Sequence, residues 1–167
     1  MEKSELFQGV GSVPFRIMEV QDIKFPVKIS QPDDVLNAVK DFRRADRECF
    51  ILLFLNSKNV IIDREVVSVG TVDCAVVYPR EVLRSAILKN AGAVILAHNH
   101  PSGDCTPSAA DLQITRNLIA GLMLAQITVH DHIIFSSDKS YSFTAEGRMP
   151  LMTTDITNKL HELGLLT

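Results

Sequence analysis

A short segment in the second half of the chain gathers side chains that bind metal ions. It reads His98-Asn-His100-Pro-Ser-Gly-Asp-Cys-Thr-Pro-Ser108-Ala-Ala-Asp111. Side chains two residues apart project to the same side of an extended chain, so His98 and His100 can face one volume. Asp111 falls on the first turns of a predicted helix and can point back into that volume. Two imidazoles and one carboxylate form a three-ligand set for zinc and leave a fourth position open.

An open fourth position is typical of a catalytic zinc site, whereas four protein ligands close a structural site. Zinc lowers the pKa of a water molecule in that position to about 7, so hydroxide becomes available at neutral pH. The segment therefore predicts hydrolytic chemistry that depends on a metal.

The same residues allow a plainer interpretation. Ser108-Ala-Ala-Asp111 is also a capping box, in which Ser108 begins a helix and Asp111 reaches back to it. The two histidines could also be ordinary polar groups at the end of a strand. A capping box does not explain paired histidines after a buried strand, so the combination favours metal binding.

The metal-binding segment follows a predicted strand and precedes a predicted helix. Residues 93–97 are a short apolar run that indicates a buried strand, and Pro101 and Gly103 force a loop after it. Residues 107–126 carry apolar side chains at helical spacing. Sites of α/β proteins usually lie at the ends of strands, as this segment does.

The rest of the chain alternates between predicted strands and helices, which predicts an α/β fold with helices flanking a mixed central β-sheet. Ser30 is the expected N-cap of the first helix. We divide the chain into an N-terminal arm (1–29), a central domain (30–147) and a C-terminal helical tail (148–167). The further strands are expected at 49–55, 60–69, 74–78, 127–135 and 141–143, and the further helices at 30–42, 79–89 and 154–163.

Composition excludes several classes of protein. The chain has 167 residues, of which 46% are hydrophobic and 22% charged, so it can bury a core and is not expected to be disordered. A net charge of −3 and a pI near 5.9 provide no basic field for a nucleic-acid backbone. We see no secretory signal and no apolar run long enough for a bilayer, and we expect a cytoplasmic protein without membrane contact. Three cysteines without a C-x-x-C pair indicate neither a disulfide framework nor an all-cysteine zinc site.

The pattern His98-x-His100, seven residues, Ser108, two residues, Asp111 resembles the metal signature of the JAMM (MPN-plus) metalloproteases. The surrounding sequence is similar to the RadC branch of that superfamily. This resemblance implies the JAMM/MPN fold, whose architecture is similar to that of cytidine deaminases, with one zinc ion. It makes the central domain a metal-hydrolase domain. Longer RadC proteins carry a helix-hairpin-helix region before this domain, where this chain has room only for an arm.

The resemblance also implies roles for individual residues. The family has a catalytic glutamate just before a short apolar strand, and Glu48 matches that placement. Glu48 would be the general base, which takes a proton from water and hands it to the leaving amine. Ser108 would hydrogen-bond the water or the developing oxyanion, as the family's serine does. Glu65 is the rival candidate and Glu81 a weaker one, and the plain alternative for Glu48 is a solvated residue at a helix end.

Two further features bear on the site. Cys105 stands where the family usually has proline; its thiol could be a fourth ligand, but we expect it only to fill the proline's place. Asp131-His132-Ile belongs to the family pattern, so we expect His132 near the sheet edge beside the site. We expect His130 on the surface and neither histidine as a metal ligand.

The expected function is a zinc-dependent hydrolase of amide bonds. A peptide or isopeptide bond in a protein conjugate is implied by the resemblance only, as is a protein partner that sets specificity. One alternative is a factor associated with DNA repair or recombination, which is the family's traditional name. The acidic balance makes direct DNA binding by this chain alone unexpected. A non-catalytic interaction module of the same fold is the other alternative, although such a module needs no set of metal ligands.

Overall fold

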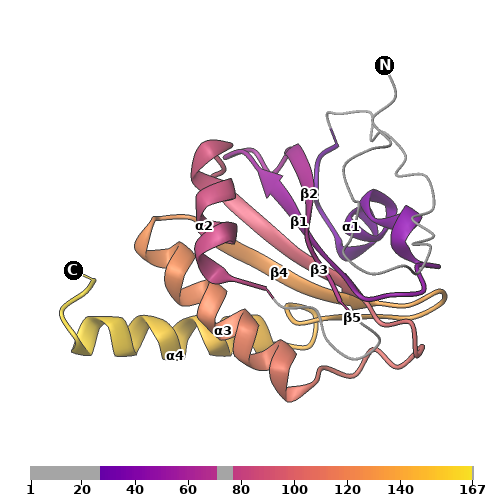
Figure 1. Ribbon diagram of the computed structural model, residues 1–167. Helices are drawn as coiled ribbons and strands as arrows, with labels where there is room; N and C mark the ends of the chain where they lie inside the picture. Colours follow the sequence, from indigo (N-terminus) through magenta and orange to yellow (C-terminus); the bar gives the residue numbers. More distant parts are fainter. Residues whose placement is uncertain (1–26, 71–76, 167) are drawn as a thin grey trace.

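Five strands form one mixed β-sheet in the computed structural model, which describes residues 27–70 and 77–166. The strand order is β2-β1-β3-β4-β5 (Figure 1). The pairs β2–β1, β1–β3 and β4–β5 are antiparallel, whereas β3 and β4 are parallel. The strands are β1 (Cys49–Leu55), β2 (Ile61–Val69), β3 (Ala93–Asn99), β4 (Thr128–Phe135) and β5 (Ser140–Ser142).

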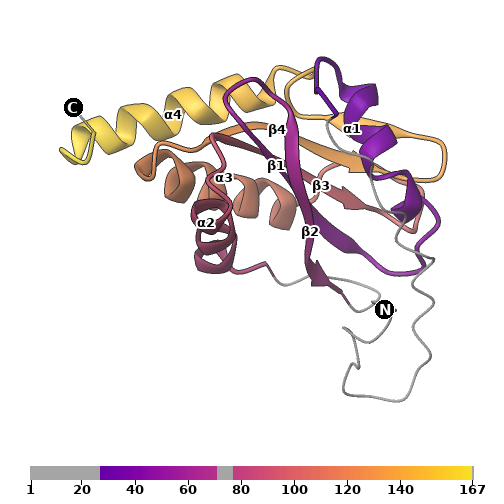
Figure 2. The ribbon, with the colours of Figure 1, turned by 90° about the horizontal axis from the view of Figure 1, so that it is seen from above.

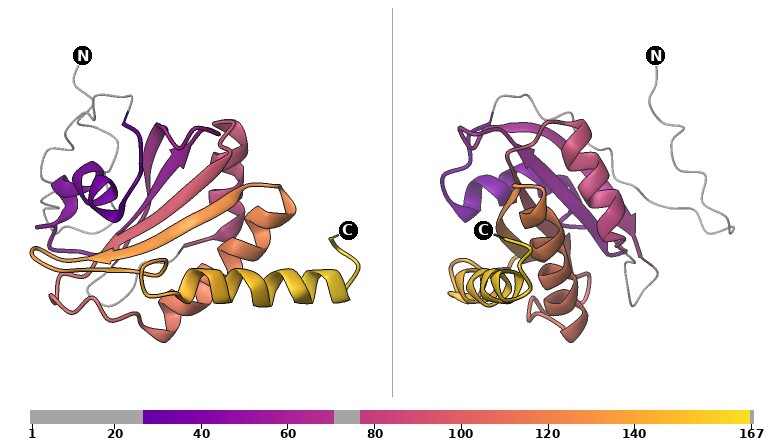
Figure 3. Two further views of the ribbon diagram at one scale, coloured as in Figure 1. Left: turned by 180° about the vertical axis from the view of Figure 1, so that it is seen from behind. Right: turned by 90° about the vertical axis from the view of Figure 1, so that its left-hand side faces the viewer.

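Helices cover both faces of the sheet. Figure 2 shows α2 and α3 on one face and α1 on the other, and Figure 3 shows α4 lying beside α3. Among the described helices, none combines the length and the apolar composition that crossing a bilayer requires. The helices are α1 (Pro32–Ala38), α2 (Pro79–Leu88), α3 (Ala109–Leu124) and α4 (Arg148–Glu162), with a 3₁₀ turn at Lys40–Phe42.

The core has two layers because successive side chains of a strand point to opposite faces of the sheet. Leu52 and Leu96 belong to the layer shared with α2, α3 and α4. Leu53 and Ile95 belong to the layer shared with α1. Every residue of β1 and β3 is buried, which is why β1 and the first five residues of β3 appear in the sequence as continuous apolar runs. The same alternation of side chains along a strand determines which face of the sheet a polar side chain at the strand end reaches.

The predicted α/β class with a mixed sheet and flanking helices is confirmed. Two details of the helices were wrong. Ser30 is not the first N-cap. Gln31 is, because the helix begins at Pro32 and Gln31 before it is still extended, with its N–H donating to the carboxylate of Asp34 three residues on. The helical spacing of apolar residues in 79–89 also predicts Ile87 on the same inner face as Val82 and Ala86. In the structure Ile87 is 53% exposed, and Val82 and Ala86 alone supply the buried face of α2.

The last helix begins at Arg148, six residues before the predicted start at Thr154. Proline is tolerated in the first turn of a helix, so Pro150 does not delay the start. Met149 and Met152 are buried in the core and hold this first turn in place. The predicted N-terminal arm is almost entirely outside the described residues, and so is most of the predicted strand at 74–78, of which Val77 and Tyr78 are not in a strand.

Candidate metal centre

Strand β3 carries His98 and His100 to one end of the sheet. It is the middle strand, and His98 lies opposite Phe50 of β1 and Ile134 of β4. His98 is only 3% exposed, and His100 directly after the strand is partly buried. Both imidazoles meet the first turn of α3, where Asp111 lies. The structure thus brings together the three residues that the sequence singles out as metal ligands.

Three ligand atoms converge at this point. His98 Nε2 lies 2.8 Å from His100 Nε2 and 3.2 Å from Asp111 Oδ1, and His100 Nε2 lies 3.8 Å from Asp111 Oδ2. In tetrahedral zinc with bonds of about 2.0–2.1 Å, two ligand atoms are roughly 3.3 Å apart. The observed distances bracket that value. Within residues 27–70 and 77–166, these three side chains are the cluster of His, Cys, Asp or Glu that could hold a metal ion.

The orientation of His100 also fits a metal ion. Its Nδ1 lies 2.6 Å from the backbone oxygen of Asp104. A carbonyl oxygen can only accept, so Nδ1 carries the proton and Nε2 of neutral His100 presents a lone pair. A lone pair 2.8 Å from another ring nitrogen is repelled unless a proton or a metal ion lies between them. The donor set therefore fits a divalent metal such as zinc.

Asp111 is oriented by the beginning of α3. Ser108 is the N-cap, and its hydroxyl accepts a hydrogen bond from the Asp111 N–H. In return, Asp111 Oδ2 accepts from the Ser108 N–H at 2.8 Å and from its hydroxyl at 2.6 Å. Burial raises the pKa of Asp111, but positive charge at His98, present only when its ring is protonated, and the hydrogen bonds from Ser108 outweigh burial and lower it below its usual range. The carboxylate is thus ionised, as a metal ligand must be.

A third histidine lies behind the cluster. His132 of β4 is fully buried, and its Nε2 is 2.9 Å from His98 Nδ1. Its Nδ1 is 2.6 Å from Thr115 Oγ1 on α3. Burial lowers the pKa of His132 well below its usual range, and the neighbouring His98 lowers it further. His132 lies beside the site, as expected, but the expected place near the sheet edge was wrong, because β4 is an inner strand paired on both sides with β3 and β5. The expected surface position of His130 agrees with its exposed side chain.

Glu48 lies at the open side of the cluster, directly before β1. Its Oε1 is 3.8 Å from His100 Nε2. The backbone on both sides of it is held by the buried side chain of Asn99. Asn99 Oδ1 accepts from the Cys49 N–H at 2.7 Å, and its Nδ2 donates to the Arg47 carbonyl at 2.9 Å. The general-base candidate is therefore held beside the three ligands by the residue between the two histidines.

The rival glutamates are engaged elsewhere. Glu65 on β2 accepts a hydrogen bond from Ser85 at 3.2 Å and pairs with Lys89 at 3.1 Å, both on or next to α2. Glu81 is exposed and pairs with Arg80. The structure places neither in the ligand cluster.

Cys105 lies in the loop between His100 and α3, but its side chain points into the core. It is 8% exposed and packs with the apolar side chains on the α2–α3 face of the sheet. It is not part of the ligand cluster in the described part of the chain. This position agrees with the expectation that Cys105 fills space in place of a proline.

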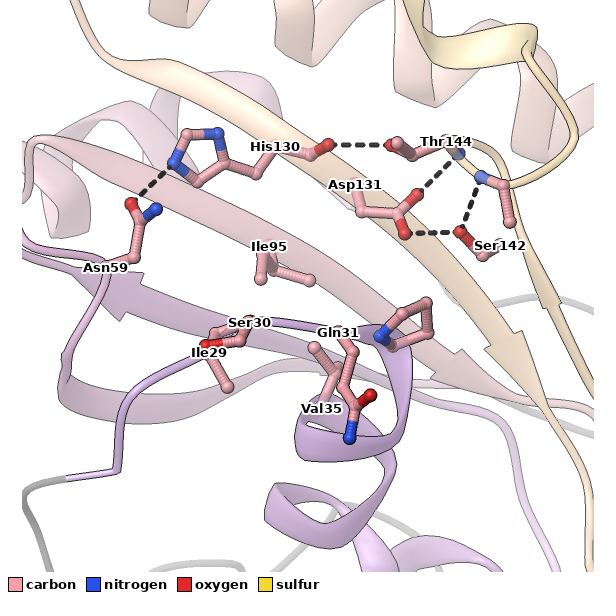
Figure 4. A pocket seen from close by; sticks show the side chains of 12 residues that line it. Ile29, Ser30, Gln31, Val35, Asn59, Ile95, His130, Asp131, Ser142 and Thr144 are labelled. Atoms are coloured by element: carbon pink, nitrogen blue, oxygen red, sulfur yellow. Dashed lines mark hydrogen bonds between the residues drawn. The ribbon is translucent and has the colours of Figure 1, made fainter.

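A separate pocket of about 310 Å³ lies on the opposite face of the sheet, beside α1 (Figure 4). Ile95 and Val35 form part of its wall, and Asp131 lies at one side of it. The Asp131 carboxylate is already bonded to the Ser142 hydroxyl and the Thr144 N–H, as Figure 4 shows. None of the predicted ligands or catalytic residues lines this pocket.

Sequence reasoning missed the structural partners of the site. Asn99 was not considered, although strand alternation places it on the face opposite His98, where it can reach the backbone around Glu48. For Thr115, the helical spacing of residues 107–126 predicts only a place on the inner side of the helix. Its contact with His132 depends on how α3 packs across β4, which no local spacing encodes.

Comparison with known proteins adds independent findings. A family model described as RadC-like JAB domain matches residues 29–148. A UPF0758 protein of Desulforamulus reducens is 45% identical over 122 residues, which cover 72% of this chain and 54% of that protein. UPF0758 protein YfjY of Escherichia coli (strain K12) is 48% identical over 102 residues, which cover 61% of this chain and 64% of that protein. A UPF0758 protein of Methanosarcina mazei is 42% identical over 121 residues, which cover 72% and 53%. The chain thus spans about half to two thirds of the length of these relatives.

Proposed function

The chain belongs to the RadC-like JAB domain family, and we propose that it is a zinc-dependent hydrolase of amide bonds. The observation that carries this proposal is the cluster of His98, His100 and Asp111, with the Glu48 carboxylate 3.8 Å from one of its ligand atoms. Three ligands and a neighbouring carboxylate are what hydrolysis by a metal-activated water requires. An interaction module of the same fold has no need of this combination.

In the proposed reaction, His98, His100 and Asp111 hold the zinc ion. When bound, zinc supplies a Lewis acid that polarises the carbonyl group and makes water more acidic. Glu48 takes a proton from the attacking water as the carbon–oxygen bond forms, and then gives it to the amine nitrogen as the carbon–nitrogen bond breaks. The products are a carboxylic acid and an amine, and Glu48 returns to its ionised form.

Ser108 is proposed to stabilise the negative oxygen of the tetrahedral intermediate. Its hydroxyl lies beside Asp111 at the beginning of α3, where the helix dipole also favours negative charge. In the described structure the hydroxyl donates to Asp111 Oδ2, so it must turn from that oxygen to serve the substrate.

We propose a peptide or isopeptide bond in a protein conjugate as the substrate, with a protein partner contributing to specificity. This part of the proposal comes from the resemblance to JAMM proteases. Duplex DNA is not the proposed substrate, because a net charge of −3 gives the chain no general attraction for phosphates. Since this chain covers only about half of the relatives from Desulforamulus reducens and Methanosarcina mazei, the proposal concerns the activity of the RadC-like JAB domain itself.

The test is hydrolysis of a panel of peptides and amide-linked conjugates by zinc-loaded protein. Glu48→Gln preserves size and removes the proton acceptor, so we expect a loss of about 10²–10⁴-fold in kcat with zinc content unchanged. Glu65→Gln is the matched control and is expected to keep its activity. Full activity in Glu48→Gln would show that Glu48 is not the base. Activity that survives complete removal of zinc, or no hydrolysis across the panel, would count against the proposal as a whole.

A further inference from the structure

Behind the proposed metal site, three hydrogen bonds form a continuous path from one of its ligands to another. The path begins at His98 Nδ1 and passes to His132 Nε2 at 2.9 Å. It continues from His132 Nδ1 to Thr115 Oγ1 at 2.6 Å. It ends where the Thr115 hydroxyl meets the backbone carbonyl oxygen of Asp111 at 2.5 Å. Strand β4 and helix α3 thus connect one ligand's ring with another ligand's backbone.

The direction of every bond in this path follows from its last member. A carbonyl oxygen only accepts, so the single proton of the Thr115 hydroxyl points to Asp111. Thr115 Oγ1 can then only accept from the ring, which requires a proton on His132 Nδ1. A neutral His132 with its proton on Nδ1 has a bare Nε2, so His98 must supply the proton between them from its own Nδ1. Neutral His98 is left with its lone pair on Nε2, the atom that faces His100 and Asp111.

The surroundings of His132 favour its neutral form. The ring is fully buried, stacked at 4.9 Å on Phe143 and tilted at 5.5 Å against Phe50. A second proton would place a charge between two apolar rings, which is costly without an ionised partner. His132 is not placed as a fourth ligand either. Its Nε2 contacts Nδ1 of His98, whereas the proposed ligand atom of His98 is Nε2.

We infer that His132 and Thr115 are positioning residues, which fix the tautomer and the ring orientation of His98 so that Nε2 is presented for metal binding. The inference rests on the proposed metal site and deepens it. Metal-binding histidines commonly donate their second N–H to a fixed acceptor, and loss of such an acceptor typically weakens metal affinity about 10–100-fold. Here the acceptor is itself a histidine, whose own orientation is fixed by a hydroxyl group on α3.

The first experiment reads the tautomers directly. Long-range ¹H–¹⁵N NMR spectra of the full chain distinguish a proton on Nδ1 from one on Nε2 for each histidine ring. We expect His132 to carry its proton on Nδ1 in the metal-free and the zinc-loaded protein, and zinc-loaded His98 to do the same. A proton on His132 Nε2 would overturn the inference. His132 would then donate to His98 Nδ1, and the lone pair of neutral His98 would lie on Nδ1 instead of on Nε2, the proposed ligand atom. A role in packing alone would not select one tautomer.

The second experiment measures zinc affinity by competition with a chelator. His132→Phe keeps an aromatic ring and removes the acceptor, so we expect zinc to bind about 10–100-fold more weakly. Thr115→Val keeps the shape of the side chain and removes the hydroxyl, and it should weaken binding in the same direction by a smaller factor. His130→Phe is the matched control, since His130 is exposed on the same strand, and it should bind zinc like the wild type.

Equal zinc affinity in Thr115→Val, His132→Phe and His130→Phe would overturn the inference and leave the proposed function standing. Thr115→Val provides the test if His132→Phe does not fold. Failure of the wild-type protein to bind zinc would instead contradict the proposed function. The tautomer of His132 in the metal-free protein would then still decide whether the hydrogen-bond path runs as inferred.

Discussion

Asp111 has two structural tasks, one for each carboxylate oxygen. Oδ2 accepts hydrogen bonds from Ser108 and so caps α3, while Oδ1 lies 3.2 Å from His98 Nε2. The two interpretations of Ser108-Ala-Ala-Asp111, a capping box and a metal ligand, are therefore compatible. The cap holds the Asp111 carboxylate in place before any metal binds. Less side-chain conformational entropy is therefore lost when a metal ion binds.

The buried thiol of Cys49, a single residue next to the site, predicts how the free energy of unfolding depends on pH. Burial, and secondarily the charge of Asp46, raises the pKa of the Cys49 thiol from 9.0 to about 11. Between these values the unfolded chain releases the thiol proton and the folded chain keeps it, so the free energy of unfolding falls as pH rises. We expect a loss of about 1 kcal/mol at pH 10 relative to pH 8 from this group.

Urea unfolding at pH 8 and pH 10 measures this loss, with Cys49→Ala as the control. The alanine variant lacks the thiol, so its stability should change less between the two pH values by about the same 1 kcal/mol. Identical pH dependence in the two proteins would show that the thiol ionises as readily in the folded chain as in the unfolded one.

At the scale of elements, the ends of β1 and β3 are joined by one side chain. Asn99, at the end of β3, bonds to the backbone of Arg47 and Cys49 at the beginning of β1, and it is 1% exposed. The Gly70 N–H also donates to the Glu48 carbonyl at 2.8 Å. Together these bonds fix the segment that carries the proposed base relative to the strand that carries two proposed ligands.

Asn99→Ala is expected to destabilise this connection. It leaves the buried Cys49 N–H without its acceptor and removes one of the donors to the Arg47 carbonyl, and a buried group without a partner costs about 1–3 kcal/mol. We therefore expect a loss of roughly 1–3 kcal/mol in the free energy of unfolding, together with reduced hydrolysis, in a protein that still binds zinc. Asn117→Ala is the control, because Asn117 makes its hydrogen bond to Gln113 on the exposed side of α3. Equal unfolding free energies for the two variants would contradict the structural role of Asn99.

Elements that are encoded locally could be predicted from the sequence. The strand at residues 49–55 was predicted with the bounds that β1 has, because a buried strand is one continuous apolar run. The convergence of His98 and His100 with Asp111 was predictable as well, since it depends on strand alternation and one helix start. The early start of α4 was not, because packing of Met149 and Met152 in the core determines it.

The environment of the site depends on contacts between distant segments, which sequence spacing does not reveal. His132 meets His98 only because β4 lies parallel to β3 in a register that pairs Leu96 with His132. Asn99 reaches Cys49 across 50 positions of the chain. Roles that need such contacts became visible only in the folded structure.

At the scale of the whole molecule, charge limits the partners that the chain can attract by itself. Its net charge is −3, and a nucleic-acid backbone repels such a field. We expect no binding of duplex DNA by this chain at protein concentrations up to about 10 μM in physiological salt. An electrophoretic mobility shift assay measures this. A shift that weakens steeply with added salt would contradict the expectation and favour the alternative of a DNA-associated factor.

The central claim is that His98, His100 and Asp111 hold one zinc ion in a RadC-like JAB domain, and elemental analysis of protein purified without a histidine tag tests it most directly. We predict about one zinc per chain in the wild type and in Glu48→Gln, because Glu48 is not a ligand in this account. We predict almost none in His98→Ala and Asp111→Ala, each of which removes one of three protein ligands. A wild-type protein without zinc, or wild-type stoichiometry retained in both alanine variants, would contradict the account.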